Sequence, residues 1–71
     1  MDDPTDLPAA VRARRRALRL GQRDLADLAG VSERFVRAVE AGKPTVQLDR
    51  LRAVLDALGL ELRVTLRGEH D

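Results

Sequence analysis

Residues 22–40 constrain the fold of this 71-residue chain more than any other segment. Gly30 divides them into two stretches, and Ser32, a residue type that favours the start of a helix, opens the second. Apolar residues recur in the first stretch at helical spacing: Leu25, Ala26, Leu28 and Ala29. Because helices this short are unstable alone, the segment predicts two helices joined by a tight turn and held by flanking helices.

The second stretch has two different faces. Val36 and Val39 share an inward face, whereas three charged residues lie outside: Glu33, Arg34 and Arg37. The major groove of B-DNA admits one α-helix, and an arginine there can bind guanine through two hydrogen bonds. The second helix is therefore predicted to read double-stranded DNA.

Charge is unevenly distributed along the chain, although the net charge is only +1. Residues 12–43 hold nine of the 13 basic side chains and four of the 12 acidic ones. This excess coincides with the two-helix segment, where DNA phosphates would lie. Arginines that only solvate helix surfaces are the alternative, but the position of the excess favours phosphate contact.

A first helix is predicted from its cap and its apolar spacing. Asp6 and Pro8 suit its first turn, and it is expected to run to about Arg19. Three of its residues share one face: Val11, Arg15 and Leu18. An arginine buried on such a face needs a partner, and Glu40, at the end of the third helix, is the best candidate.

The boundaries of the other helices are predicted from glycines and capping residues. Gly21 should open the second helix and Gly30 should end it in a left-handed conformation. The third helix, capped by Ser32, should close around residues 41–42. Thr45 is expected to cap a fourth helix over roughly 46–58, with five apolar residues on its inner face: Leu48, Leu51, Val54, Leu55 and Leu58.

Residues 60–67 alternate between apolar and polar at every position, which predicts a β-strand with one wet face. A lone strand leaves its backbone groups unpaired, so we expect it to pair with the same strand of a second copy. The resulting antiparallel ribbon would bury four apolar side chains from each copy of a homodimer: Leu60, Leu62, Val64 and Leu66. A flexible tail is the alternative, but it leaves the alternation unexplained.

Composition argues against other classes of protein. The chain has no cysteine, and its only histidine, His70, has no nucleophile or metal-ligand spacing near it. No apolar stretch approaches the length of a membrane span, and the acidic N-terminus does not read as a secretory signal. A single aromatic residue makes single-strand binding by base stacking improbable. We therefore expect no enzyme activity, no metal and no cofactor.

The chain resembles the lambda-repressor-like (Xre/Cro) helix-turn-helix family over residues 8–58. The residues responsible agree in order and spacing: Arg15, Leu18, Leu20, Gln22, Leu25, Ala26, Ala29, Gly30, Val31, Ser32, Val36, Glu40, Gly42 and Lys43. With residues 60–67 added, it is most similar to HipB-type antitoxin repressors, in which a C-terminal strand joins the dimer. The resemblance implies a mainly α, four-helix DNA-binding domain over 8–58 and the dimerisation strand at 60–67. The residues themselves predict a flexible acidic lead-in at 1–7 and leave a tail at 68–71.

The resemblance also assigns roles to individual residues. Base readout is expected from the start of the third helix: Ser32, Glu33, Arg34 and Arg37. Phosphate contacts are expected from Gln22, Arg23 and Lys43, and Gln22 should also brace the recognition helix. Arg15 and Glu40 match a structural ion pair of the family. Solvated surface, or pairing with Glu33, remains the alternative for Arg34 and Arg37.

Three further features bear on the interface. Phe35 either packs half-buried against the fourth helix or touches a thymine methyl group, and the half-buried position is favoured. Gly21 replaces the more usual hydroxyl residue, which removes one phosphate contact. Five arginines cannot all reach DNA, although one or two are expected to touch its backbone: Arg12, Arg14, Arg16, Arg19 and Arg23.

These expectations describe a sequence-specific transcriptional repressor that binds an inverted-repeat operator as a homodimer. The HipB-type likeness implies the antitoxin of a type II toxin–antitoxin pair, autoregulating its operon, partnered with a HipA-like toxin and located in a prokaryotic cytoplasm on the nucleoid. Only four residues follow Arg67, which argues against neutralisation by a long toxin-binding tail. The alternatives are a regulator without a toxin, or an adaptor that has lost DNA contact and presents an apolar patch instead.

Overall fold

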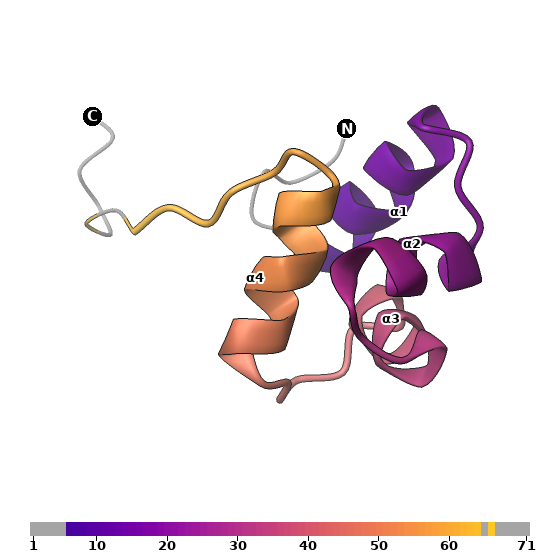
Figure 1. The fold of residues 1–71 in the computed structure, drawn as a ribbon. Helices are drawn as coiled ribbons and strands as arrows, with labels where there is room; N and C mark the ends of the chain where they lie inside the picture. The colour runs from indigo at the N-terminus through magenta and orange to yellow at the C-terminus, as the bar shows by residue number, and fades with distance from the viewer. Residues whose placement is uncertain (1–5, 65, 67–71) are drawn as a thin grey trace.

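The computed structural model describes residues 6–64 and residue 66. It contains four helices: α1 (Leu7–Ala17), α2 (Gln22–Ala29), α3 (Glu33–Glu40) and α4 (Leu48–Ala57). Helix α2 packs against both α3 and α4, and α1 packs against α3 (Figure 1). The mainly α, four-helix architecture predicted from the sequence is confirmed over these residues. None of the described helices has the length and apolar character needed to cross a membrane.

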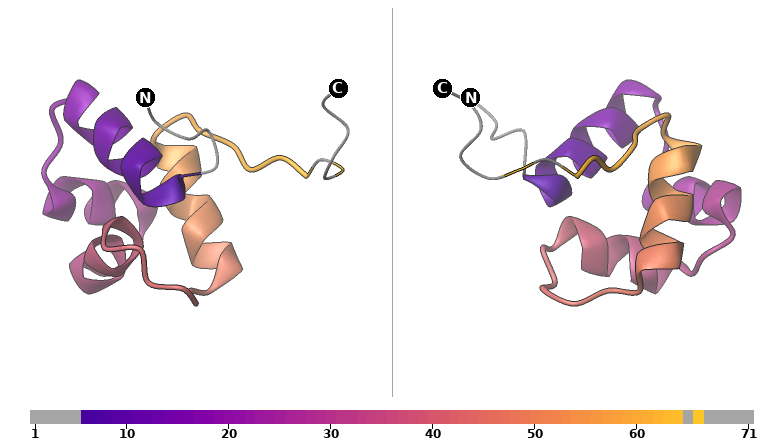
Figure 2. Two further views of the ribbon diagram at one scale, coloured as in Figure 1. Left: turned by 180° about the vertical axis from the view of Figure 1, so that it is seen from behind. Right: turned by 90° about the vertical axis from the view of Figure 1, so that its left-hand side faces the viewer.

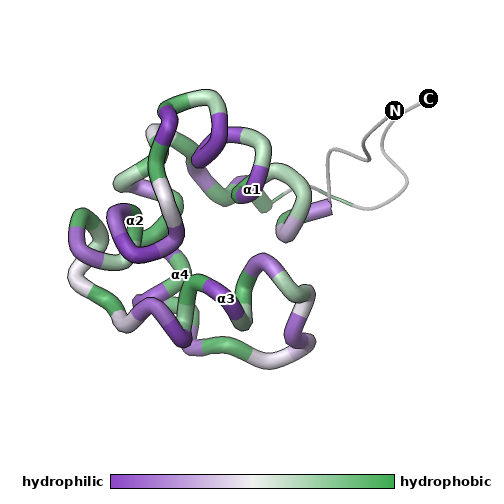
Figure 3. Tube along the Cα trace, turned by 90° about the vertical axis from the view of Figure 1, so that its right-hand side faces the viewer, coloured by the Kyte–Doolittle hydropathy of each residue, from purple (hydrophilic) through white to green (hydrophobic). Residues whose placement is uncertain are grey.

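The core takes apolar residues from all four helices and from the end of α4: Val11, Leu25, Ala26, Val36, Val39, Leu51, Val54, Leu55 and Leu58. Hydrophobic and hydrophilic residues are interspersed along the helical segments of the chain (Figure 3). None of the four described helices exceeds 11 residues, so each depends on burying its apolar side against the others. The two-helix segment is therefore stable only as part of the whole domain.

Three leucines predicted on apolar faces are exposed instead. Leu28 is 64% exposed because the buried face of α2 is centred on Leu25, Ala26 and Ala29, and at about 100° per residue Leu28 falls outside it. Leu48 is 60% exposed, since the whole first turn of α4 stands at the edge of the core. Leu18, at the end of α1, is 41% exposed.

All four helices end with one residue at positive φ: Arg19, Gly30, Gly42 and Gly59. After α1, the N–H of Leu20 donates to the carbonyl of Arg15 and that of Arg19 to the carbonyl of Arg16, which is the Schellman pattern. The left-handed Gly30 is confirmed, with φ of 72°. Helix α1, expected to reach about Arg19, ends at Ala17 because Arg19 turns the chain at φ 59°.

Side chains cap two helix starts as predicted. Asp6 Oδ1 accepts from the N–H of Ala9 at 3.2 Å, and Ser32 Oγ accepts from the N–H of Phe35 at 3.0 Å. Gly21 precedes α2 as expected, and its N–H donates to Asp24 Oδ2 at 2.8 Å. These bonds satisfy backbone N–H groups that have no partner within their helices.

The prediction that Thr45 caps the fourth helix is wrong. Helix α4 begins two residues later than expected, at Leu48, after Gln47, whose side chain makes no capping bond. Residues 43–47 instead form a non-helical connection from which Val46 packs half-buried against the core. Tertiary packing of Val46 thus overrides the local capping preference of Thr45.

Beyond α4, residues 60–64 run as an extended segment away from the helices (Figure 2). Leu60 packs against the core, whereas Leu62, Val64 and Leu66 are 47%, 101% and 76% exposed. Within the part of the chain that the structure describes, this segment pairs with no strand. Residues 65 and 67, part of the predicted strand, lie outside the described residues, as do 1–5 of the predicted lead-in and the predicted tail at 68–71.

The core assignment can be tested with two leucines of the same helix. Leu25 is fully buried, so Leu25→Ala should lower the free energy of unfolding by about 2–5 kcal/mol. Leu28→Ala, the matched control, should change it by no more than about 0.5 kcal/mol. Urea unfolding followed by circular dichroism measures both, and equal losses would contradict the placement of α2.

Candidate nucleic-acid interface

A buried ion pair joins α1 to the end of α3. Arg15 Nε lies 2.6 Å from Glu40 Oε2, and Arg15 Nη2 donates to Glu40 Oε1 at 2.9 Å. The two residues are only 9% and 6% exposed. Arg15 Nη1 also donates to the carbonyl of Leu20 at 2.8 Å, and Arg12 Nη1 to the carbonyl of Glu40 at 2.6 Å. The structure therefore contains the pair expected from the sequence, and it ties three chain segments together.

The pair shifts the pKa values of both groups toward their charged forms. The hydrogen bond to Glu40 raises the pKa of Arg15 above its ordinary value, against the opposing effect of burial. Burial alone would raise the pKa of Glu40, but hydrogen bonds from Arg15 and Gln22, with the charges of Arg15 and Arg12, hold it below its ordinary value. Glu40 is therefore a carboxylate near neutral pH.

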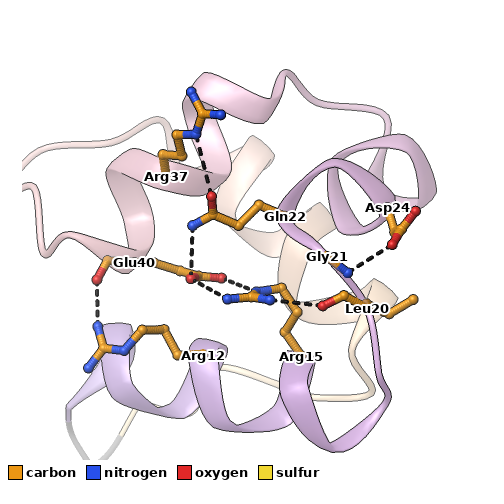
Figure 4. A network of polar contacts seen from close by, with 8 residues as sticks. All are labelled: Arg12, Arg15, Leu20, Gly21, Gln22, Asp24, Arg37 and Glu40. Carbon is orange, nitrogen blue, oxygen red and sulfur yellow. Dashed lines mark hydrogen bonds and ion pairs between the residues drawn. The ribbon is translucent and has the colours of Figure 1, made fainter.

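Gln22, the first residue of α2, connects this pair to the outer face of α3. Its Nε2 donates to Glu40 Oε1 at 3.1 Å, and its Oε1 accepts from Arg37 Nε at 3.4 Å (Figure 4). A carboxylate can only accept and a guanidinium can only donate, so the side-chain amide has one favourable orientation. Gln22 thus connects the start of α2 to α3, which is the arrangement that a bracing role requires.

The exposed face of α3 divides into two sides. On the side toward α2, Arg37 Nη2 lies 2.7 Å from Glu33 Oε2 in an (i, i+4) ion pair, and Arg37 also contacts Gln22. On the other side, Arg34 lines an open groove of about 420 Å³ and enters no ion pair among the described residues. Of the two arginines, only Arg34 is free of such restraints.

The groove lies between α3, the connection 43–47 and the first turn of α4. Its walls include three apolar side chains, Phe35, Ala38 and Val46, together with the exposed Lys43. Phe35 is half-buried against the core, the position favoured from the sequence. Ser32, at the N-cap of α3, also lines the groove.

Comparison with known proteins gives matches that span the four helices described above. A helix-turn-helix family model matches residues 11–64, from α1 through α4. The chain belongs to the lambda-repressor-like helix-turn-helix family. It is also similar to an uncharacterized HTH-type transcriptional regulator, y4mF, of Sinorhizobium fredii, with 42% identity over 66 residues that span 93% of this chain and 87% of the relative. The chain is thus a helix-turn-helix transcriptional regulator and not an enzyme.

Two arginines of this helix-turn-helix domain have structural bonds that sequence reasoning missed. Arg14 Nε donates to the carbonyl of Leu58 at 2.8 Å, and Arg12 bonds the carbonyl of Glu40. Their partners lie 44 and 28 residues away in the chain, so no local pattern signals them. Arg16, Arg19 and Arg23 are exposed.

Removal of one partner of the buried pair should strongly destabilise the domain. Glu40→Gln leaves the Arg15 guanidinium buried without its counter-charge and should lower the free energy of unfolding by about 3–5 kcal/mol at neutral pH. Asp27→Asn removes one exposed carboxylate from α2 and should cost no more than about 0.5 kcal/mol. Urea unfolding at pH 7 compares both variants with the parent chain.

The loss of stability in Glu40→Gln should also depend on pH. Because folding depresses the pKa of Glu40, its stabilising effect is complete above the ordinary value of 4.5 and disappears as pH falls through the folded value. The difference between the parent chain and Glu40→Gln should therefore shrink below about pH 4.5. A difference that stays constant from pH 7 to pH 3 would rule out the paired carboxylate as its source.

Proposed function

We propose that this regulator is a sequence-specific repressor that inserts α3 into the major groove of double-stranded DNA. The observation that carries the proposal is the division of α3. Its inner side is fixed to α1 and α2 through Arg15, Glu40 and Gln22, while its exposed side presents Arg34 without an ion-pair partner among the described residues. A rigid helix with a free arginine suits readout of guanine.

Residues around α3 are suited to phosphate contact. Gln22 uses one N–H of its amide on Glu40, so the other remains for a phosphate oxygen. Arg23 and Lys43 are exposed, before and after α3 in the chain. In this proposal Ser32 and Glu33 approach base edges with Arg34, while Arg37 reaches a base or a phosphate only by leaving Glu33.

We infer that repression requires a homodimer. Leu62, Val64 and Leu66 are exposed in the single chain, and the alternating pattern of 60–67 suits an antiparallel ribbon with a second copy. Such a ribbon would set two recognition helices about 34–36 Å apart, one turn of B-DNA. The operator would then be an inverted repeat.

The finer version of the function is an antitoxin that autoregulates its operon and binds a HipA-like toxin. The likeness of residues 60–67 to HipB-type repressors supports it, and a stand-alone regulator is the other form of the same DNA-binding function. Co-purification with the product of a neighbouring gene distinguishes the two. An adaptor that has lost DNA contact fits less well, since the outer face of α3 carries charged residues instead of an apolar patch.

Base readout can be separated from phosphate contact with two variants. Arg34→Ala should lower affinity for the operator by about 1–3 kcal/mol and relax base preference, because it removes a base contact. Lys43→Ala should weaken binding to all duplexes alike and reduce the salt dependence. Binding to a panel of operator variants at several salt concentrations measures both, and unchanged selectivity in Arg34→Ala would refute the readout assignment.

The ribbon can be tested by placing a charge on its apolar face. Leu62→Asp should give monomers that bind half-sites weakly, because the ribbon would bury an unpaired carboxylate. Leu28→Asp adds the same charge at another exposed leucine, outside the segment, and should leave the dimer intact. Sedimentation at micromolar concentration gives the oligomeric state, and a parent chain that is monomeric even on DNA would exclude the dimer.

A further inference from the structure

The described apolar residues of the segment after α4 fall into two groups. Leu60 packs against the core of its own domain, and its N–H donates to the carbonyl of Leu55 at 2.8 Å. Leu62, Val64 and Leu66 are instead 47%, 101% and 76% exposed. The apolar face that a second copy can cover therefore begins at Leu62, and Val64 is the midpoint of its three described residues.

The other face of the segment is charged. Arg63 Nε lies 2.8 Å from Glu61 Oε2 in an ion pair whose two side chains are both exposed. Successive side chains of an extended chain point to opposite faces, so this pair marks the face that stays in water. Two copies must therefore meet with apolar residues opposite apolar ones, which requires a two-fold axis that passes through a residue and not between two residues.

The side chains that would lie opposite one another decide which residue is on the axis. An axis through Arg63 would set this residue opposite itself, and like charges directly opposite are destabilising. An axis through Leu62 would set Leu60 opposite Val64, although Leu60 already packs within its own domain. An axis through Val64 sets Leu62 opposite Leu66 and separates the two copies of Arg63. An axis further along would leave Leu62 outside the apolar pairs.

A hollow of about 380 Å³ lies between this segment and α4. Its lining includes three charged residues and four apolar ones, Leu48, Leu55, Leu62 and Val64, and Leu48 is 60% exposed. Residues directly opposite in an antiparallel pair have Cβ atoms about 4.5–5.5 Å apart. With the axis at Val64, Leu66 of the second copy would lie opposite Leu62 and so beside the hollow, where it would supply an apolar side chain.

We propose that the two-fold axis of the homodimer passes through Val64, so that Val64 lies opposite its own copy and Leu62 opposite Leu66 of the second copy. The inference rests on the proposed function, which requires a homodimer, and adds the register in which the two copies pair. A second copy is the favoured occupant of this face because the face is complementary to itself. Its two outer leucines lie at equal distances along the chain from Val64.

The sequence contains no cysteine, so single-cysteine variants report the register directly. In a glutathione redox buffer, Val64→Cys should form a disulfide-linked dimer, because directly opposite Cα atoms lie about 4.5–5.5 Å apart. Leu62→Cys should stay unlinked, since its two copies would lie about 14 Å apart, four residues along the strands. Arg63→Cys should also stay unlinked at about 8 Å, beyond the reach of a disulfide. Electrophoresis without reductant measures the linked fraction.

The double variant Leu62→Cys with Leu66→Cys is the matched control. It should link two copies, whereas each of its single variants should not, and it tests the same register if Val64→Cys weakens the dimer. Linkage by Leu62→Cys or Arg63→Cys alone, with Val64→Cys unlinked, would overturn the register. A dimer that neither Val64→Cys nor the double variant links would also overturn it. If sedimentation shows the parent chain to be monomeric even on DNA, the proposed homodimer itself fails, which is a different outcome.

Discussion

The contact between Arg15 and Glu40 is the interaction on which the other parts of this domain depend. It links the first helix to the end of α3 across 25 residues of sequence, at a position from which water is largely excluded. Two charges so placed are tolerated only because each finds its partner and further hydrogen bonds. The pair therefore holds the end of α3 against α1 and, through Gln22, against the start of α2.

Much of the fold follows from local signals in the sequence. Gly30 and Ser32 mark the turn and the start of α3 because each has a backbone or capping requirement that few other residues satisfy. The partnership of Arg15 with Glu40 could be anticipated because a charge on an apolar face must be neutralised. Features that depend on such local requirements can be predicted from the sequence alone.

Other features depend on distant parts of the chain and had no local signal. Thr45 is an acceptable capping residue, yet packing of Val46 delays α4 until Leu48. Arg14 resembles any surface arginine in the sequence, but it donates to the carbonyl of Leu58, a residue 44 positions further along the chain. The groove beside α3 could not be predicted from the sequence either, since it depends on how α3, the connection 43–47 and α4 are placed relative to one another.

The two sides of the exposed face of α3 differ in how many contacts within the domain a substitution would remove. A substitution of Arg37 removes its ion pair with Glu33 and its hydrogen bond to Gln22, whose amide also contacts the buried Glu40 carboxylate. Arg34 has no such ties among the described residues, so a replacement there alters only what the helix presents outward. Under the proposed function, new operator preferences can therefore arise at position 34 without loss of a contact within the domain, whereas a change at position 37 also removes contacts with Glu33 and Gln22.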